Sequence, residues 1–183
     1  MIKVLIADDH TLFRDGLRRI FGEADGIEVV AEAIDGKDTI KKAKEYDWDI
    51  VLLDINFPDM NGLEVLKRIS SANLPSYVLV LSMYSEEEYA IRAMRSGASG
   101  YMTKDSPTDQ LINVIHCLAN GGKYVDSELE EKLLFTHAVN SEGLMHTAFS
   151  DREFHVFKLL VSGESLTSIA NKLSLSVKTV STY

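Results

Sequence analysis

Short apolar runs alternate with amphipathic segments of helical period along the first 120 residues of the chain. The runs are rich in Val, Ile and Leu, and they lie at Ile2–Ala7, Val29–Ala33, Ile50–Leu53, Tyr77–Leu81 and Gly100–Thr103. Such runs are typical of strands that are buried on both faces, as in a parallel sheet covered by helices. Between the runs, apolar side chains recur at helical spacing, for example at Phe13, Leu17, Ile20 and Phe21. Five strand–helix units predict an α/β fold with a five-stranded, parallel, doubly wound sheet.

Polar residues and glycines indicate where the intervening helices begin and end. Asp38, Asn61 and Ser85 stand where side chains that cap free backbone N–H groups are favoured. Gly97 and the pair Gly121-Gly122 stand where helices commonly end.

The character of the sequence changes after residue 121. We interpret residues 122–147 as a partly helical linker, because their second half shows no steady period. Residues 148–183 contain two helical segments and the start of a third. The last 40 residues, from position 144, carry a net charge of +1, whereas the whole chain carries −9. The acidic first part would repel nucleic acid, but the second part would not.

Composition excludes several classes of protein. The 183 residues are 45% apolar and 26% charged, which is the usual balance of a soluble globular protein. No apolar run approaches the roughly 18 residues of a membrane-spanning helix, and the N-terminus is unlike a signal peptide, so we expect a cytoplasmic protein with no membrane partner. The single cysteine, Cys117, and the five histidines show no metal-ligand spacing. We therefore interpret His10 as part of a loop and expect no metal binding through histidine.

Chemically distinctive side chains stand at the end of four predicted strands. Asp8 and Asp9 follow the first strand, Asp54 the third, Ser82 the fourth and Lys104 the fifth. Because ligands of open parallel sheets bind at the carboxyl ends of strands, these groups are expected to converge. Clustered carboxylates favour a shared Mg²⁺ ion, and an ammonium and a hydroxyl suit phosphoryl oxygens. Any one of these groups could simply mark a strand leaving the core, but the combination favours a phosphoryl-transfer site.

The same residues resemble a known family. Residues 1–121 resemble a response-regulator receiver domain of the flavodoxin-like fold, and the whole chain resembles two-component response regulators of the NarL/FixJ family, whose output is a LuxR-type helix-turn-helix. The resemblance rests on the acidic pair, the segment LLDINFPDMNG around Asp54, on Ser82, and on GASGYMTKD, which contains Tyr101 and Lys104. Pro58 and Gly62 also match the family pattern.

The resemblance implies a phosphoacceptor and a magnesium site. Asp54 would be the phosphoacceptor, and its donor would be a phosphohistidine on a sensor histidine kinase. Asp9, Asp54 and the backbone carbonyl of Asn56 would bind Mg²⁺ directly, and Asp8 would act through water.

The resemblance also implies how the phosphorylated state is sensed. Lys104 would pair with the phosphoryl oxygens, and Ser82 would move toward the phosphate after transfer. Tyr101 would follow Ser82 inward as the second switch residue. By this resemblance the chain is not an enzyme, and it supports only its own aspartyl phosphorylation and dephosphorylation.

Residues 166–183 predict a helix-turn-helix. Their apolar spacing suits a pair of crossed helices, with core positions at Ile169, Ala170, Leu173, Leu175, Val180 and Tyr183. Together with the segment FSDREFHVFKLLVSGES, this stretch resembles the LuxR-type DNA-binding domain. By resemblance the recognition helix starts near Val177, Ser181 and Thr182 face bases, and Lys178 and Thr179 contact phosphate. Each of these four side chains taken alone also suits an ordinary solvated helix face.

The family pattern continues past Tyr183, so we expect a C-terminally truncated domain with weak or no specific DNA binding. For the intact protein the expected partners are a sensor histidine kinase, promoter DNA and, when phosphorylated, a second copy of the chain. One alternative is a phosphorylation-dependent protein-interaction switch without DNA binding. Another is a phosphatase or phosphotransferase with an aspartyl nucleophile, which would need an acid where Asn56 stands.

Overall fold

The computed structural model describes residues 1–72, 74–83, 87–125, 149–173 and 175–182. They belong to two compact units, formed by residues 1–136 and 137–183. Most of the predicted linker lies outside the described residues, as do Ser85 and Tyr183.

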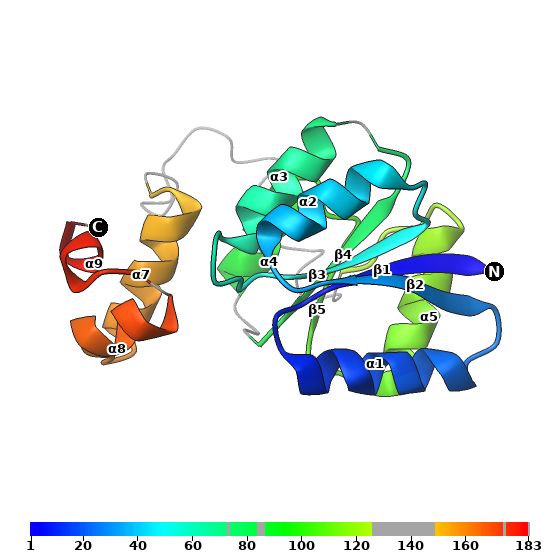
Figure 1. Ribbon diagram of the computed structural model, residues 1–183, viewed down its shortest axis with the longest axis horizontal. Coiled ribbons are helices and arrows are strands. Elements are labelled where there is room, and N and C mark those ends of the chain that lie inside the picture. The colour runs from blue at the N-terminus through cyan, green and yellow to red at the C-terminus, as the bar shows by residue number, and fades with distance from the viewer. Residues whose placement is uncertain (73, 84–86, 126–148, 174, 183) are drawn as a thin grey trace. The chain divides into compact units, whose positions relative to one another are not determined.

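Five parallel strands form the sheet of the first unit, in the order β2-β1-β3-β4-β5 (Figure 1). The strands are β1 (Ile2–Ala7), β2 (Ile27–Ala33), β3 (Ile50–Asp54), β4 (Tyr77–Ser82) and β5 (Gly100–Thr103). The prediction of a five-stranded parallel sheet is confirmed, and the strand order is that of flavodoxin-like folds. β1 and β5 have the predicted bounds, whereas the other three strands are slightly longer than predicted.

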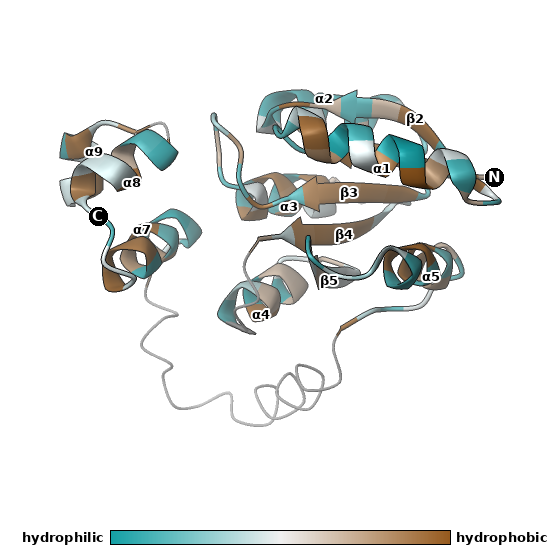
Figure 2. Ribbon diagram, turned by 90° about the horizontal axis from the view of Figure 1, so that it is seen from below, coloured by the Kyte–Doolittle hydropathy of each residue, from teal (hydrophilic) through white to brown (hydrophobic). Residues whose placement is uncertain are grey.

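Helices cover both faces of this sheet, with α1 and α5 on one side and α2, α3 and α4 on the other (Figure 1). Their bounds are α1 (Thr11–Glu23), α2 (Gly36–Glu45), α3 (Gly62–Ser71), α4 (Glu87–Arg95) and α5 (Thr108–Ala119). Figure 2 shows β3 and β4 as hydrophobic along most of their length, whereas α1 and α5 alternate in character. Alternation along a helix leaves one apolar stripe, which here packs on the sheet.

The core on this side contains side chains from the sheet, from α1 and from α5. It includes Val4, Ile6, Leu17, Phe21, Ile50, Leu52, Leu79, Leu81, Met102, Leu111, Val114, Ile115 and Leu118. Because the middle strands are buried on both faces, only their two ends can offer polar groups to solvent.

Helix starts agree in part with the sequence signals. Asn61 caps α3, since its side-chain oxygen accepts a hydrogen bond from the backbone N–H of Leu63 at 2.8 Å. The cap of α2 is Asp35, and Asp38 lies in the first turn and donates its backbone N–H to that cap. The prediction for Asp38 is therefore wrong by one helical turn, because two aspartates three residues apart both suit a helix start.

Gly62 lets the first turn of α3 pack directly against the end of β3. Its backbone N–H donates to the Ile55 carbonyl at 2.6 Å. A Cβ atom at this position would lie 2.1 Å from the Asp54 carbonyl oxygen and 2.6 Å from the Ile55 Cα. Since both neighbours are backbone atoms, no side-chain rotation can relieve the clash.

The second unit is a small helical domain formed by α7 (Asp151–Val161), α8 (Leu166–Lys172) and α9 (Val177–Thr182). Its core contains Val156, Leu159, Ile169, Ala170 and Val180, with Leu173 and Leu175 packed against it. The Leu175 backbone N–H donates to the Ala170 carbonyl at 2.8 Å and closes the turn between α8 and α9. The predicted helix-turn-helix is confirmed for the described residues, and its second helix, α9, starts at Val177 as predicted.

Within the part of the chain that the structure describes, every helix is too short or too polar to cross a membrane.

We expect Gly62→Ala to lower the free energy of unfolding of the first unit by about 1–3 kcal/mol, because the added methyl group collides with backbone. Gly16→Ala is the matched control, since nothing lies within 4 Å of a Cβ atom there. Inside α1 that change should stabilise by about 0.5–1 kcal/mol. Urea unfolding followed by the fluorescence of the buried Trp48 measures both values, and equal effects of the two variants would contradict the packing role of Gly62.

We expect the second unit to lose stability as the pH falls from 6.5 to about 4. Burial lowers the pKa of His155 from 6.5 to about 4, so the unfolded chain binds a proton in this window and the folded unit does not. The loss should reach roughly 3 kcal/mol at the acid end. Hydrogen exchange of α7–α9 peptides measures it, and His155→Leu should flatten the slope. An unchanged slope in His155→Leu would show that other groups cause the acid sensitivity.

Candidate functional site

The carboxyl ends of four strands meet at one edge of the sheet. The strand register sets Ala7 beside Leu53, Asp54 beside Leu81 and Ser82 beside Thr103. The polar residues that end or follow these strands are therefore neighbours in space, although they are far apart in the chain. The convergence expected from the sequence is confirmed for Asp8, Asp9, Asp54, Ser82 and Lys104.

A buried ammonium group joins two of the carboxylates. The Lys104 Nζ atom lies 2.6 Å from Asp8 Oδ2 and 2.8 Å from Asp54 Oδ2. All three side chains are at most 4% exposed. The same ammonium lies 4.7 Å from the centre of the Phe13 ring, a favourable position for a cation–π contact. Lys104 is thus fixed by two ion pairs and one aromatic face.

Asp54 combines deep burial with an incomplete set of partners. Burial raises the pKa of its carboxyl group, the charge of Lys104 lowers it and the charge of Asp8 raises it, and the resulting pKa is about 6. Its Oδ2 atom bonds to Lys104, but the buried Oδ1 atom has no hydrogen-bond partner. A buried carboxylate oxygen without a partner is costly, so this atom is suited to bind a ligand or a cation.

Arg14 supports the loop that carries the acidic pair, and the sequence alone did not indicate this role. Its guanidinium is buried, with Nη1 donating to the Asp8 carbonyl at 2.7 Å and Nε donating to Glu32 Oε2 at 2.9 Å. The first of these bonds ties α1 to the loop that carries the acidic pair. In the sequence, an arginine one turn into a helix looks like an ordinary surface residue, so nothing pointed to this role.

His10 is the second residue that the sequence did not reveal. Its Nδ1 atom lies 2.9 Å from Asp9 Oδ1, 3.1 Å from Asp8 Oδ1 and 3.8 Å from Asp54 Oδ2. One ligand atom from each of these four residues lies within 4.8 Å of the others. His10 therefore belongs to the acidic cluster, rather than to the loop alone.

The helix-turn-helix offers a polar face on α9. Lys178, Ser181 and Thr182 are exposed. Thr179 is half-buried, and its Oγ1 atom lies 2.7 Å from the Ser176 hydroxyl, which also accepts the Thr179 backbone N–H. Thr182 donates its hydroxyl to the Lys178 carbonyl at 2.9 Å. Three of the four side chains that the resemblance assigned to DNA are thus accessible, and Thr179 also helps to begin the helix.

Two family models match the chain, one on each unit. Residues 4–116 match the response regulator receiver domain, and residues 147–183 match the bacterial regulatory proteins of the luxR family. The chain belongs to the response-regulator family. It is a transcriptional response regulator of the NarL/FixJ type, with a receiver domain followed by a LuxR-type helix-turn-helix.

Two of the similar curated proteins match over the full length of this chain. It is 33% identical to response regulator GacA of Pseudomonas syringae pv. syringae, matching all of this chain and 86% of that protein. It is 30% identical to response regulator UvrY of Escherichia coli K12, matching all of this chain and 84% of that protein.

A solved structure agrees with the fold. A LuxR-family two-component response regulator from Aurantimonas sp. SI85-9A1 is 28% identical, with a TM-score of 0.67 over 74% of this chain and 97% of that one.

The remaining receiver positions lie on β4, on β5 and in the loop after β3. Ser82 is fully buried at the end of β4, and its carbonyl accepts the backbone N–H of Lys104 at 2.8 Å. Tyr101 is buried on β5, beside Val80 of β4. Asn56 follows β3 and pairs with Asn61 in an isolated antiparallel bridge. The bridge closes the loop between Asp54 and α3.

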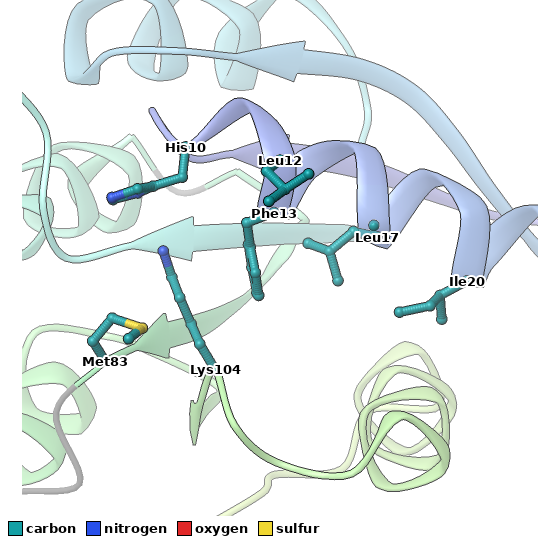
Figure 3. A pocket seen from close by; sticks show the side chains of 8 residues that line it. His10, Leu12, Phe13, Leu17, Ile20, Met83 and Lys104 are labelled. Atoms are coloured by element: carbon teal, nitrogen blue, oxygen red, sulfur yellow. The ribbon is translucent and has the colours of Figure 1, made fainter.

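An apolar pocket of about 420 Å³ opens beside the receiver site. Leu12, Phe13, Leu17 and Ile20 of α1 form one wall, and Met83 and Lys104 lie opposite (Figure 3). Figure 3 shows the nitrogen ends of His10 and Lys104 at the same end of the pocket. The acidic cluster therefore has an apolar flank on the α1 side.

We expect Lys104→Met to lower the free energy of unfolding of the receiver domain by about 3 kcal/mol without divalent cations, because two buried carboxylates lose their counter-charge. The double variant Lys104→Met/Asp8→Asn should recover much of that loss, since one of the two charges is then absent. Trp48 fluorescence in urea with EDTA measures these values, with the exposed Lys37→Met as control. If Lys104→Met alone were as stable as wild type, the ion pairs would not dominate the stability of this site.

Proposed function

We propose that Asp54 accepts a phosphoryl group from a phosphohistidine of a sensor histidine kinase and that its phosphorylation controls the LuxR-type domain. The observation that carries this proposal is the Asp54 carboxylate itself. It ends β3, is held by Lys104 at 2.8 Å, and keeps one buried oxygen without a hydrogen-bond partner.

The acidic cluster fits Mg²⁺. Asp8, Asp9 and Asp54 supply hard carboxylate oxygens, and the orphaned Asp54 oxygen is a position that a cation would satisfy. We assign Asp9, Asp54 and the Asn56 carbonyl as direct ligands and Asp8 as a ligand through water. Bound Mg²⁺ would supply positive charge to the oxygens of the transferred group.

The residues of the chain then carry out the transfer. The Asp54 carboxylate attacks phosphorus in line, so that a P–O bond forms while the P–N bond of the phosphohistidine breaks. The imidazole of the donor keeps the bonding electron pair. Lys104 already lies beside Asp54, so its ammonium can pair with a phosphoryl oxygen with little rearrangement. Most of the catalysis is positioning and electrostatics, as is usual for phosphoryl transfer.

Phosphorylation would be sensed by Ser82 on β4 and Tyr101 on β5. The Ser82 hydroxyl would turn toward the phosphoryl oxygens, and Tyr101 on the neighbouring strand would follow it. Both side chains are buried on neighbouring strands, so a change of position of either one requires the side chains around it to repack. The new charge thus biases a two-state element of the receiver.

The output would be promoter DNA recognised by α9. We assign Lys178 and Thr179 to phosphate contacts and Ser181 and Thr182 to base edges. We also assign residues 1–121 to the receiver, 122–147 to a linker and 148–183 to the output domain. A homodimer formed on phosphorylation suits the twofold symmetry of most operators. Apart from turnover of its own aspartyl phosphate, we assign the chain no enzymatic activity.

Intact-mass spectrometry after incubation with Mg²⁺ and acetyl phosphate tests this proposal. We expect one added phosphoryl group on wild type and none on Asp54→Ala. Asp47→Ala is the matched control, because this exposed aspartate lies at the opposite end of β3 and should gain mass as wild type does. EDTA should abolish the gain. Added mass on Asp54→Ala would place the acceptor elsewhere, and no gain on any variant, even with a kinase as donor, would overturn the proposal.

A further inference from the structure

The loop between β3 and α3 carries Asn56, whose backbone carbonyl we assign to Mg²⁺, and the side chain of Asp59 ties this loop to α2. Asp59 Oδ1 accepts the backbone N–H of Gly36 at 2.8 Å, and Oδ2 accepts that of Lys37 at 3.1 Å. These two donors are the first residues of α2, and they lie 23 and 22 positions before Asp59 in the chain. α2 and α3 lie side by side on one face of the sheet, so the carboxylate joins two neighbouring parts of the fold (Figure 1).

α2 also has a cap of its own. Asp35 accepts the backbone N–H of Asp38 at 2.7 Å with its carboxylate and that of Thr39 at 3.0 Å with its carbonyl. The first four N–H groups of a helix have no partner within it, and Asp35 and Asp59 together satisfy all four of α2. Asp35 acts within the helix start, whereas Asp59 connects the helix start to the loop that follows the phosphoacceptor.

The loop is short, and it is held at its base and at its tip. Its base is closed by the bridge between Asn56 and Asn61. At its tip, the buried Met60 side chain packs on Gly36, where an added Cβ atom would collide with it. The bonds of Asp59 act at the same place, and hydrogen bonds to an ionised carboxylate are strong. The backbone of Asn56, three residues before Asp59, is therefore held between the end of β3 and the start of α2.

We propose that Asp59 is a positioning residue for phosphorylation: by holding the loop to α2, it keeps the Asn56 carbonyl in place for Mg²⁺. Residues that orient a metal ligand without touching the metal contribute about tenfold to a hundredfold to metal affinity. This inference rests on the proposed cation site and goes beyond it, because it assigns Asp59 no contact with the ion or the phosphoryl group. Coupling between two sites is reciprocal, so bound Mg²⁺ must in turn tighten the contact between Asp59 and α2.

Asp59→Ala and Asp35→Ala separate this role from helix capping. Each variant removes one carboxylate from the start of α2 and the hydrogen bonds that it accepts there, but of the two only Asp59→Ala releases the loop. Asp59→Asn is the conservative variant, since its amide oxygen can still accept one of the two N–H groups, and it also serves if the alanine variant does not fold. Urea unfolding followed by Trp48 fluorescence verifies the fold of each variant.

The first measurement is the Mg²⁺ dependence of acetyl-phosphate labelling of the full chain, followed as added mass. For Asp59→Ala we expect the Mg²⁺ concentration at half-maximal rate to rise about tenfold. The rate at saturating Mg²⁺ should stay within about twofold of wild type, because Asp54 and Lys104 remain in place. Asp59→Asn should show a smaller rise, and Asp35→Ala should behave as wild type. Calorimetric titration with Mg²⁺ alone should rank the variants in the same order.

The second measurement is hydrogen exchange of the Gly36 and Lys37 amides in the wild-type chain, followed by NMR. Because the coupling is reciprocal, saturating Mg²⁺ should slow the exchange of both amides by up to the same tenfold. The amide of Asp38, which is bound by Asp35, is the internal control and should respond less. A carboxylate that only caps α2 would not make these amides respond to Mg²⁺.

Three outcomes would overturn this inference while leaving the proposed cation site intact. Unchanged Mg²⁺ affinity in Asp59→Ala would mean that Asp59 only caps α2. An equal loss of affinity in Asp35→Ala would mean that the order of α2, and not the hold of Asp59 on the loop, sets the affinity. Exchange at Gly36 and Lys37 that ignores Mg²⁺ would contradict the coupling. If wild type itself neither binds Mg²⁺ nor gains mass, the proposed cation site and this inference both fail.

Discussion

The ion pairs of Lys104 with Asp8 and Asp54 are the constraint on which the receiver domain depends. They join residues that are 96 and 50 positions apart in the chain, and all three side chains are almost completely buried. Burying an ammonium and two carboxylates is costly unless the charges meet at hydrogen-bond distance. They meet only if β1, β3 and β5 end at the same edge of the sheet. The parallel topology and the site are therefore mutually dependent, since an error in register would leave charges buried without partners.

A rigid backbone frame keeps these charges in place. Arg14 ties α1 to the loop after β1, and Gly62 brings the first turn of α3 against the end of β3. Neither residue has to touch a phosphoryl group. They restrain the backbone around the Asp54 carboxylate, which would favour the proposed phosphoryl transfer. The apolar side chains of α1 form the wall of the pocket that flanks Lys104 on one side of the same site.

The output domain is stabilised in a different way. Its described core includes Phe154 and a few aliphatic side chains. Its helices begin at serine caps such as Ser150, whose hydroxyl and the Glu153 carboxylate form a reciprocal capping box. The cap at Ser176 plays the same part for α9, which presents the exposed polar residues. Among its described residues a buried histidine, His155, makes the domain sensitive to acid. The two domains are thus held together by different kinds of interaction.

The sequence by itself determined the strands, their parallel pairing, the helix-turn-helix and most of the site. Runs of Val, Ile and Leu between helical segments are typical of strands buried on both faces of a parallel sheet, and that sheet places Asp54 and Lys104 at one edge. The sequence located a helix N-cap correctly where one residue alone could cap the helix, as at Asn61. It was ambiguous where two nearby residues could both do so, as at Asp35 and Asp38. Only the tertiary structure decided the roles of Arg14 and His10. Their side chains act across the loop after β1 on groups from other strands, and distances between strands are not encoded in local periodicity.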